Sequence, residues 1–340
     1  MSILRDYVRM FLGRAELNGS DAELFLDALI SESDESLLND VFQSWNQKGI
    51  TADEIFEIAS IMRRRCVPVT SAHETFVDIV GTGGSRNKTF NVSTAAAFVV
   101  AGAGVPVAKH GNKAATSNSG SADVLTELGV DPAVDANTAE KCLNEIGICF
   151  MFAPNFHRLS PTLGKVRRGL GFPTIFNCVG PLCNPAGAPH QLIGVWKEDL
   201  VPKMANALSR LGTKRSWIVY GCDSVDEISL ASATLVAEVK DDGSITRMEV
   251  NAGDFGIPAE ASKDLNVSLP EESADLIRAI LSDEKKDTSA ERLLLCNAAA
   301  ALYISGKAQT LPDAFAAATE SIRTGSALEK LTQLAAATKA

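Results

Sequence analysis

The chain has 340 residues, of which 46% are hydrophobic and 22% charged, with a formal net charge of −10 at pH 7. This composition is typical of a globular protein of roughly two domains, and its acidic balance argues against non-specific binding to nucleic acid. No apolar run reaches the ~20 residues of a membrane span and no signal-peptide core is present, so we expect a cytoplasmic protein without membrane partners. The seven cysteines are scattered without a Cys-x-x-Cys pair, so reduced thiols are expected rather than a zinc site or a disulfide framework.

Residues 1–72 are expected to be helical. Leu4, Val8, Phe11 and Leu12 fall on one face of a first helix, and further amphipathic segments follow. The last of them, Asp53–Arg65, is ended by Pro68. Its run of three arginines, residues 63–65, fits either an anion site or charges that face water and interact with the helix dipole.

A glycine-rich turn follows the apolar run Phe76–Val80 and leads into an alanine-rich helix. The apolar run predicts a strand buried on both faces. Glycines can adopt positive φ and bring backbone N–H groups close to an anion, and the N-terminus of the helix would direct its dipole at the same anion. The sequence therefore predicts a phosphate cradle made of Gly81, Gly83, Gly84, Asn91, Ser93 and Thr94.

A second unit repeats this arrangement. A short strand from Val105 ends in Lys109, a polar loop covers Lys113–Ser121, and a helix is expected over Ala122–Gly129. Because the carboxyl ends of neighbouring parallel strands meet at one edge of a sheet, both loops are expected at one ligand site.

Strands and helices alternate through the rest of the chain, which predicts an α/β fold. The turn-dense segment Gly180–Pro189 is expected to be irregular, as a hinge or a lid. After a strand over Ser216–Tyr220, the acidic residues Asp223, Asp226 and Glu227 emerge near the phosphate loops. By itself, such an acidic pair is more typical of a solvated surface loop. Further strands are expected over Ile148–Ala153, Leu192–Trp196 and Leu235–Val239, and helices over Thr162–Gly171, Val201–Leu211, Glu271–Ile304 and Leu311–Ala337.

Six motifs in one order carry a resemblance to a known family. They are Gly81-Thr-Gly-Gly84, Asn91-Val-Ser-Thr94, Lys109-His-Gly-Asn112, Val166-Arg-Arg168, Asn177-x-x-Gly-Pro-Leu-x-Asn-Pro185 and Asp226-Glu227. Any one of them is weak evidence, but together the chain resembles the anthranilate phosphoribosyltransferases. The resemblance implies the nucleoside-phosphorylase type of fold: a small all-helical domain and a larger α/β domain whose mainly parallel central sheet is flanked by helices. The helical domain is expected at residues 1–72, completed by helices from within about 140–190, with the large domain at 73–340 and homodimers formed through the helical domain.

The resemblance also implies transfer of the phosphoribosyl group of 5-phosphoribosyl-1-diphosphate to the amine of anthranilate, a step of tryptophan biosynthesis, with Mg²⁺ as cofactor. The implied catalytic residues are Lys109, Asp226 and Glu227, and the implied Mg²⁺ ligands are Ser93, Asp226 and Glu227. The implied anthranilate contacts are Gly81, Asn112, His157 and Arg167. The implied contacts of the diphosphate sugar are Gly81, Gly83, Gly84, Ser85, Thr89, Asn91, Val92, Ser93, Thr94, Lys109, His110, Gly111, Asn112, Lys113, Ser117 and Ser121.

Three positions depart from the family pattern. Ser85 stands where the family commonly has Asp, Lys113 where it has Arg, and His157-Arg-Leu-Ser160 where it has His-Pro-Ala. Without the resemblance, Lys109 could be an exposed side chain at a strand end. A histidine beside a glycine is commonly a hydrogen-bonded structural residue, so His110 is assigned no proton chemistry. Two other functions remain open: a pyrimidine nucleoside phosphorylase, and a non-catalytic relative that binds nucleic acid.

Overall fold

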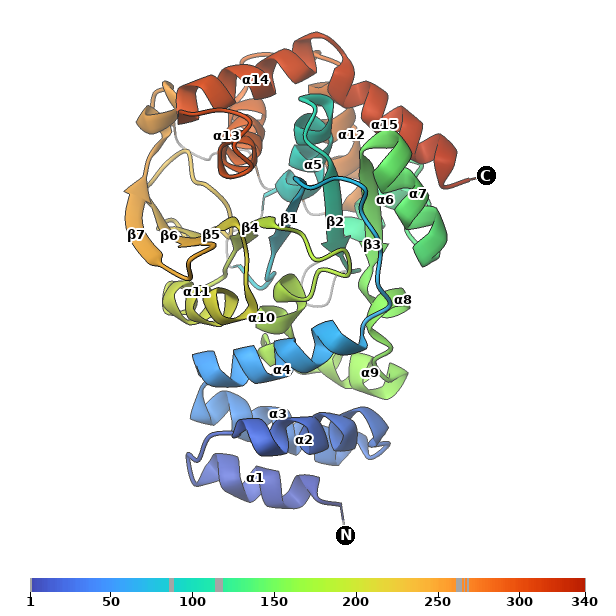
Figure 1. The fold of residues 1–340 in the computed structure, drawn as a ribbon, viewed down its shortest axis with the longest axis vertical. Helices are drawn as coiled ribbons and strands as arrows, with labels where there is room; N and C mark the ends of the chain where they lie inside the picture. The colour runs from blue at the N-terminus through green and yellow to red at the C-terminus, as the bar shows by residue number, and fades with distance from the viewer. Residues whose placement is uncertain are drawn as a thin grey trace.

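The computed structural model describes residues 2–85, 89–113, 119–260, 265, 267 and 269–339. Within them, a seven-stranded sheet has the order β3-β2-β1-β4-β5-β6-β7 (Figure 1). The strands β1 to β5 run parallel, whereas β6 and β7 are antiparallel additions at one edge. The predicted mainly parallel sheet is confirmed. The strands are β1 (Val77–Gly81), β2 (Val107–Gly111), β3 (Ile148–Phe152), β4 (His190–Gly194), β5 (Arg215–Gly221), β6 (Thr234–Lys240) and β7 (Ile245–Val250).

Helices cover both faces of this sheet, and α1 to α4 stack at one end of the molecule (Figure 1). No helix of the described ranges is long and apolar enough to cross a membrane. The helices are α1 (Leu4–Leu12), α2 (Gly19–Ser31), α3 (Glu35–Lys48), α4 (Ala52–Arg65), α5 (Val92–Gly102), α6 (Ser121–Glu127), α7 (Ala136–Ile146), α8 (Ala153–His157), α9 (Pro161–Gly169), α10 (Ile175–Leu182), α11 (Leu200–Leu211), η1 (Ala252–Phe255), α12 (Pro270–Leu281), α13 (Ser289–Ile304), α14 (Leu311–Arg323) and α15 (Ser326–Ala337).

Two apolar cores lie on the two faces of the sheet. One face, to which Ile79 of β1 contributes, packs against α5, α6, α7 and α12 to α15. The other face, to which Val80 contributes, packs against α10 and α11 and continues into α1 to α4 and α9. Successive residues of β1 point to opposite faces, so the strand is buried on both sides as its composition predicts. The division of the chain into domains at residue 72 stays a prediction.

A buried carboxylate ties the N-terminal helices together. Glu54 begins α4 as part of a capping box with Thr51. Its carboxylate also accepts hydrogen bonds from the Leu17 N–H at 3.0 Å, the Trp45 Nε1 at 3.0 Å and the Lys48 ammonium at 2.8 Å. The connection between α1 and α2 is thereby joined to α3 and α4.

The structure corrects several expectations about local structure. Leu12 is 58% exposed, although its spacing predicts a buried face. Arg63 is partly buried and donates to the Leu182 and Leu211 carbonyls at the ends of α10 and α11, whereas Arg64 and Arg65 are exposed, as the helix-dipole alternative expects. The helices α7 and α8 and the strand β7 were not predicted from the sequence, although α7 has a capping side chain in Asp135 and a clear apolar face.

The prediction that residues 180–189 are wholly irregular is wrong at their start. The helix α10 begins after Thr174, whose N–H donates to the Asn177 side chain, and it includes Gly180 and Pro181. It ends one residue after Pro181, because proline has no N–H to continue the ladder. The remaining residues, 183–189, form the predicted loop.

Candidate active site

A cavity of about 700 Å³ lies at the carboxyl ends of β1 and β2 and faces α9 and α10. Cavities of this size hold small molecules. Every predicted site residue that the structure describes lines it, with the exception of Thr94. Thr94 is fully buried and its hydroxyl donates to the Asn91 side chain at 2.8 Å, so it supports the start of α5. Ser117 lies outside the described residues.

The glycine-rich turn has two kinds of glycine. Gly83 and Gly84 have φ values of 64° and 85°, as the cradle prediction requires. Gly81 does not adopt positive φ, so the expectation is wrong there; instead a Cβ on Gly81 would lie 2.8 Å from the Asp226 carboxylate. Gly81 pairs in register with Gly194 of β4, and a Cβ on Gly194 would overlap the Asp226 carbonyl oxygen. The two paired glycines make room for the acidic loop at the site.

The acidic pair is held by the glycine-rich segment. The Ser85 hydroxyl donates to Asp226 and the Thr89 hydroxyl donates to Glu227, each at 2.9 Å. Burial and the neighbouring Asp226 charge raise the pKa of Glu227 well above its ordinary value. Two carboxylates that repel each other in a cavity are a suitable binding site for a cation.

The donor atoms fit Mg²⁺. Asp226, Glu227 and the Ser93 hydroxyl provide only oxygen ligands, which Mg²⁺ prefers, and all three residues line the cavity. No group of three His, Cys, Asp or Glu side chains suited to a metal occurs in the described residues. An ion held here would therefore take further ligands from water and from an anionic substrate, as Mg²⁺ commonly does.

Lys109 brings a buried positive charge to the same end of the cavity. Its side chain is 3% exposed, so the alternative of an exposed lysine at a strand end is wrong. Its ammonium donates to the Ile79 carbonyl at 2.6 Å and to the Ser93 hydroxyl at 3.2 Å. Burial lowers the pKa of Lys109 to about 8, and the Asp78 carboxylate opposes that decrease.

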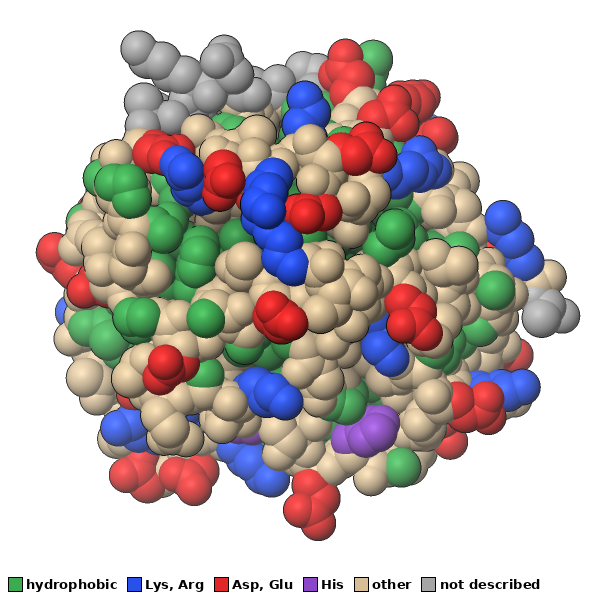
Figure 2. Space-filling view, turned by 90° about the horizontal axis from the view of Figure 1, so that it is seen from above, with side chains coloured by type: hydrophobic (Ala, Val, Ile, Leu, Met, Phe, Trp, Pro, Cys, Tyr) green, Lys and Arg blue, Asp and Glu red, His purple; other side chains and the backbone are tan. Residues whose placement is uncertain are grey.

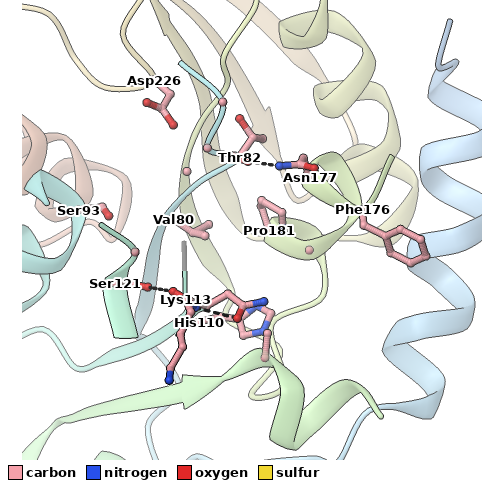
Figure 3. Close-up of a pocket in the computed structure, with 18 of the residues that line it drawn as sticks. Val80, Thr82, Ser93, His110, Lys113, Ser121, Phe176, Asn177, Pro181 and Asp226 are labelled. Atoms are coloured by element: carbon pink, nitrogen blue, oxygen red, sulfur yellow. Dashed lines mark hydrogen bonds between the residues drawn. The ribbon is translucent and has the colours of Figure 1, made fainter. Parts of the chain in front are cut away.

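Arg167 provides the charge at the opposite end. Its guanidinium lies over the Phe176 ring, 4.9 Å from the ring centre, and its buried Nε has no hydrogen-bond partner among the described residues. Burial, together with the neighbouring Arg168 charge, lowers the pKa of Arg167 to about 10. A buried guanidinium without a carboxylate is well suited to an anionic ligand. Figure 3 shows Ser93 and Asp226 on one side of the cavity and Phe176 on the other.

Two histidines face each other near Arg167. The Nε2 atoms of His110 and His157 are 3.1 Å apart, so one ring must donate and the other accept. Because the ring of His110 is also hydrogen-bonded to the Gly180 backbone, His157 is the donor and its other nitrogen, Nδ1, is a buried acceptor without a partner. Burial lowers the pKa of His157 to about 4, and that of His110 well below its ordinary value.

Sequence reasoning missed a set of mainly apolar lining residues. Phe176 is part of an apolar helical run and Met62 belongs to α4, so both have the pattern of ordinary core residues. Both lie far from the polar loops in sequence, so nothing in the sequence indicated that they line the same cavity. Asn177 is part of a noted motif; its side chain donates to the Thr82 carbonyl at 3.0 Å and connects α10 to the turn (Figure 3). The lining residues without an assigned role include Met62, Thr82, Leu163, Phe176, Asn177 and Pro181.

The parallel sheet, the glycine-rich turn and the oxygen donors at the strand ends are an arrangement that an α/β glycosyltransferase would use. Residues 73–328 match the family described as "Glycosyl transferase family, a/b domain". The chain is 45% identical over 291 residues to the anthranilate phosphoribosyltransferase of Anaeromyxobacter dehalogenans, covering 86% of this chain and 85% of that one. The chain belongs to the anthranilate phosphoribosyltransferase family.

Two solved structures share the whole fold. The crystal structure of anthranilate phosphoribosyltransferase from Thermus thermophilus superimposes with a TM-score of 0.89 at 33% identity, covering 98% of this chain and 100% of that one. The Saccharomyces cerevisiae anthranilate phosphoribosyltransferase in complex with PRPP and Mg also gives 0.89, at 28% identity, covering 99% of this chain and 98% of that one. The expected fold type is confirmed.

Proposed function

We propose that the protein transfers the phosphoribosyl group of 5-phosphoribosyl-1-diphosphate to the amine of anthranilate, giving N-(5-phosphoribosyl)anthranilate and diphosphate in tryptophan biosynthesis. The observation that carries this proposal is one cavity with the glycine-rich turn and Lys109 at one end and, at the other, Arg167, whose Nε has no hydrogen-bond partner among the described residues. One end suits a diphosphate sugar, and the other suits an aromatic carboxylate. Because both ends belong to one cavity, the two substrates can react directly.

At the donor end, backbone N–H groups of the glycine-rich turn and the start of α5 bind phosphate oxygens. Lys109 places its ammonium beside Ser93, where the diphosphate would lie. Asp226, Glu227 and Ser93 would hold Mg²⁺, which when bound neutralises charge on the leaving diphosphate. This chain is acidic overall, so the local cations are essential for binding a polyanion.

At the acceptor end, Arg167 forms a bidentate pair with the anthranilate carboxylate, and the contact with the Phe176 ring holds the planar guanidinium in position. The unpartnered His157 Nδ1 can accept a hydrogen bond from the amine. Asn112, at the end of β2, lines the cavity between the two ends and orients the ring.

The reaction requires no strong base. The aromatic amine is neutral at pH 7, so its lone pair attacks C1 of the ribose while the C1–O bond to diphosphate breaks and that electron pair leaves with the diphosphate. The proton is lost from nitrogen after the new C1–N bond has formed. Most of the rate enhancement then comes from positioning and from charge stabilisation of the leaving group.

The decisive assay follows the loss of anthranilate fluorescence when the full chain is mixed with 5-phosphoribosyl-1-diphosphate, with and without Mg²⁺. Parallel assays use thymidine plus phosphate, and duplex DNA at two salt concentrations. Turnover of thymidine alone would instead indicate a nucleoside phosphorylase, and salt-dependent DNA binding would indicate the nucleic-acid-binding relative. Figure 2 shows acidic and basic side chains interspersed over the end of the molecule that it views, unlike a basic nucleic-acid groove.

The same proposal includes a homodimer formed through a helical domain at residues 1–72. Leu12 in α1 and Leu24 in α2 are 58% and 54% exposed, and exposed apolar side chains on these helices support self-association. Replacing both with Glu should give a monomer in sedimentation experiments, and a sedimentation coefficient equal to that of the wild type would contradict this interface. The cytoplasmic location stays a prediction.

A further inference from the structure

Main-chain pairing between β1 and β2, the strands that carry the two polar loops, stops early. β1 pairs with β4 at five positions, from Val77 to Gly81. Its pairing with β2 is limited to Val77 and Val107. Beyond that pair, side chains rather than the neighbouring strand satisfy main-chain groups of both strands. The two strands are therefore separated by polar side chains at the point where the site begins.

Three side chains fill this space, and we call Asp78, Lys109 and Asn184 the polar wedge. The Asp78 carboxylate accepts the His110 N–H at 3.1 Å. The Lys109 ammonium donates to the Ile79 carbonyl at 2.6 Å. The Asn184 amide donates at 2.8 Å both to the Ala108 carbonyl and to Asp78. Each bond replaces part of a ladder that two ordinary parallel strands would share.

The wedge contains two charged groups in the interior. Asp78 is 0% exposed, Lys109 3% and Asn184 5%. Buried charge pairs are rarely more stable than apolar side chains of similar volume, and the adjacent pairing of β2 with β3 runs over five positions without such a wedge. Stability of the sheet is therefore a poor explanation for the charges.

The two charged members have different access to the cavity. Lys109 lines it and Asp78 does not. Burial raises the pKa of Asp78 to about 6, while Asn184, Lys109, the His110 N–H and Gln191 stabilise its charged form. The Asp78 carboxylate in turn favours the charged form of Lys109. Asp78 therefore acts on the site only through its neighbours.

We propose that Asp78 is a positioning residue for the diphosphate of the donor sugar and acts through Lys109. Through the His110 N–H it fixes the end of β2 directly after Lys109, and the Lys109 ammonium, held on the Ile79 carbonyl next to Asp78, is thereby directed between the two polar loops. This role rests on the proposed function. It predicts a defect in binding of the sugar, with the acceptor end intact.

The test is a double-mutant cycle on the full chain with Asp78→Asn, Lys109→Met and the double variant. Affinity for 5-phosphoribosyl-1-diphosphate with Mg²⁺ is measured by calorimetry, and KM values are measured for both substrates. We expect Asp78→Asn to weaken sugar binding about tenfold, within the range of coupled neighbours, with the KM for anthranilate changed less than about twofold. In the Lys109→Met background, the same change should alter sugar affinity by less than about twofold.

Ser321→Ala is the matched control, because Ser321 is another buried polar residue, 3% exposed, that donates to a main-chain carbonyl remote from the cavity. It should leave sugar affinity unchanged. Equal loss from Asp78→Asn in the wild-type and Lys109→Met backgrounds would overturn the proposal, as would equal increases in both KM values. If Asp78→Asn does not fold, Asn184→Ala replaces it in the cycle, because Asn184→Ala removes a hydrogen bond to Asp78 without removing a charge. Additive losses of sugar affinity in that cycle would also overturn the proposal. Wild-type protein that neither binds the sugar nor transfers it would count against the proposed function instead.

Discussion

Replacing Arg167 with Met should separate substrate affinity from stability. The guanidinium has a buried Nε without a partner and stacks on Phe176. A hydrogen-bonded pair with a charged group contributes about 1.5–3 kcal/mol. The KM for anthranilate should therefore rise about 10- to 150-fold, at 1.4 kcal/mol per factor of ten. The KM for the sugar diphosphate should change little, because the lost contact lies at the other end of the cavity.

The same substitution should stabilise the unliganded protein. The pKa of Arg167 falls from 12.5 to about 10, so at pH 7 the folded state carries the cost of desolvating a charge that the unfolded chain leaves in water. After allowance for solvent screening, this cost is about 1–3 kcal/mol. Arg167→Met should raise the free energy of unfolding in urea by a similar amount.

Initial rates at varied anthranilate and varied sugar, together with urea unfolding, measure both effects. Lys165→Met is the matched control, because Lys165 lies on the same helix, is 66% exposed and pairs with Glu35. It should change neither KM nor stability appreciably. A larger rise in the KM for the sugar than in that for anthranilate would assign Arg167 to the phosphate site and refute this reasoning.

Four further outcomes are expected. Replacing Asp226 and Glu227 together with Ala should raise the Mg²⁺ concentration needed for half-maximal activity, and an unchanged Mg²⁺ titration would contradict their role. His110→Asn should lose much less kcat than Lys109→Ala; a loss of about 10²–10⁴-fold with both substrates still bound would show that His110 acts as a base. Gly194→Ala should lower kcat/KM on the order of 10²-fold by displacing Asp226. Gly253→Ala, where a Cβ meets no atom within 4 Å, should leave kcat/KM unchanged. Equal kcat/KM values for the two variants would contradict the role of Gly194 in making room for the acidic loop. Burial lowers the pKa of His157 from 6.5 to about 4, so the unfolded chain takes up the proton first as pH falls. The folded state should therefore lose stability between pH 6.5 and 4, by about 2 kcal/mol at pH 5. His157→Gln should reduce this loss in urea unfolding, and an unchanged pH dependence of the free energy of unfolding would refute the prediction.

The fold was predictable wherever local chemistry and packing agree. The run before Gly81 is apolar at nearly every position, so its burial on both faces followed directly from composition. The cradle glycines were predictable for a similar reason, because Gly83 and Gly84 must adopt positive φ. Both predictions rest on one short stretch of chain, in which neighbouring residues specify each other's conformation.

The rest depended on contacts between distant segments. Gly81 was predicted to adopt positive φ, and that reason was wrong. The position is constrained by the Asp226 carboxylate, which belongs to a segment more than a hundred residues later in the sequence. Leu12 fits the helical period, but its side chain is 58% exposed. The Arg167 Nε has no hydrogen-bond partner among the described residues because of how distant segments pack around it, and no spacing in the sequence indicates that.

The core beneath the site is assembled from two separated stretches of chain, and this affects the order of events during synthesis. Phe42 of α3 packs against Phe176 of α10, with ring centres 6.2 Å apart, and α9 and α10 complete the apolar core that α1 to α4 begin. The ribosome must add residues 66–182 before that surface can close, which at about 5–20 residues per second takes on the order of 10 s. During this interval the nascent chain presents an unfinished apolar surface, which makes α1 to α4 the segment where chaperone binding is expected first.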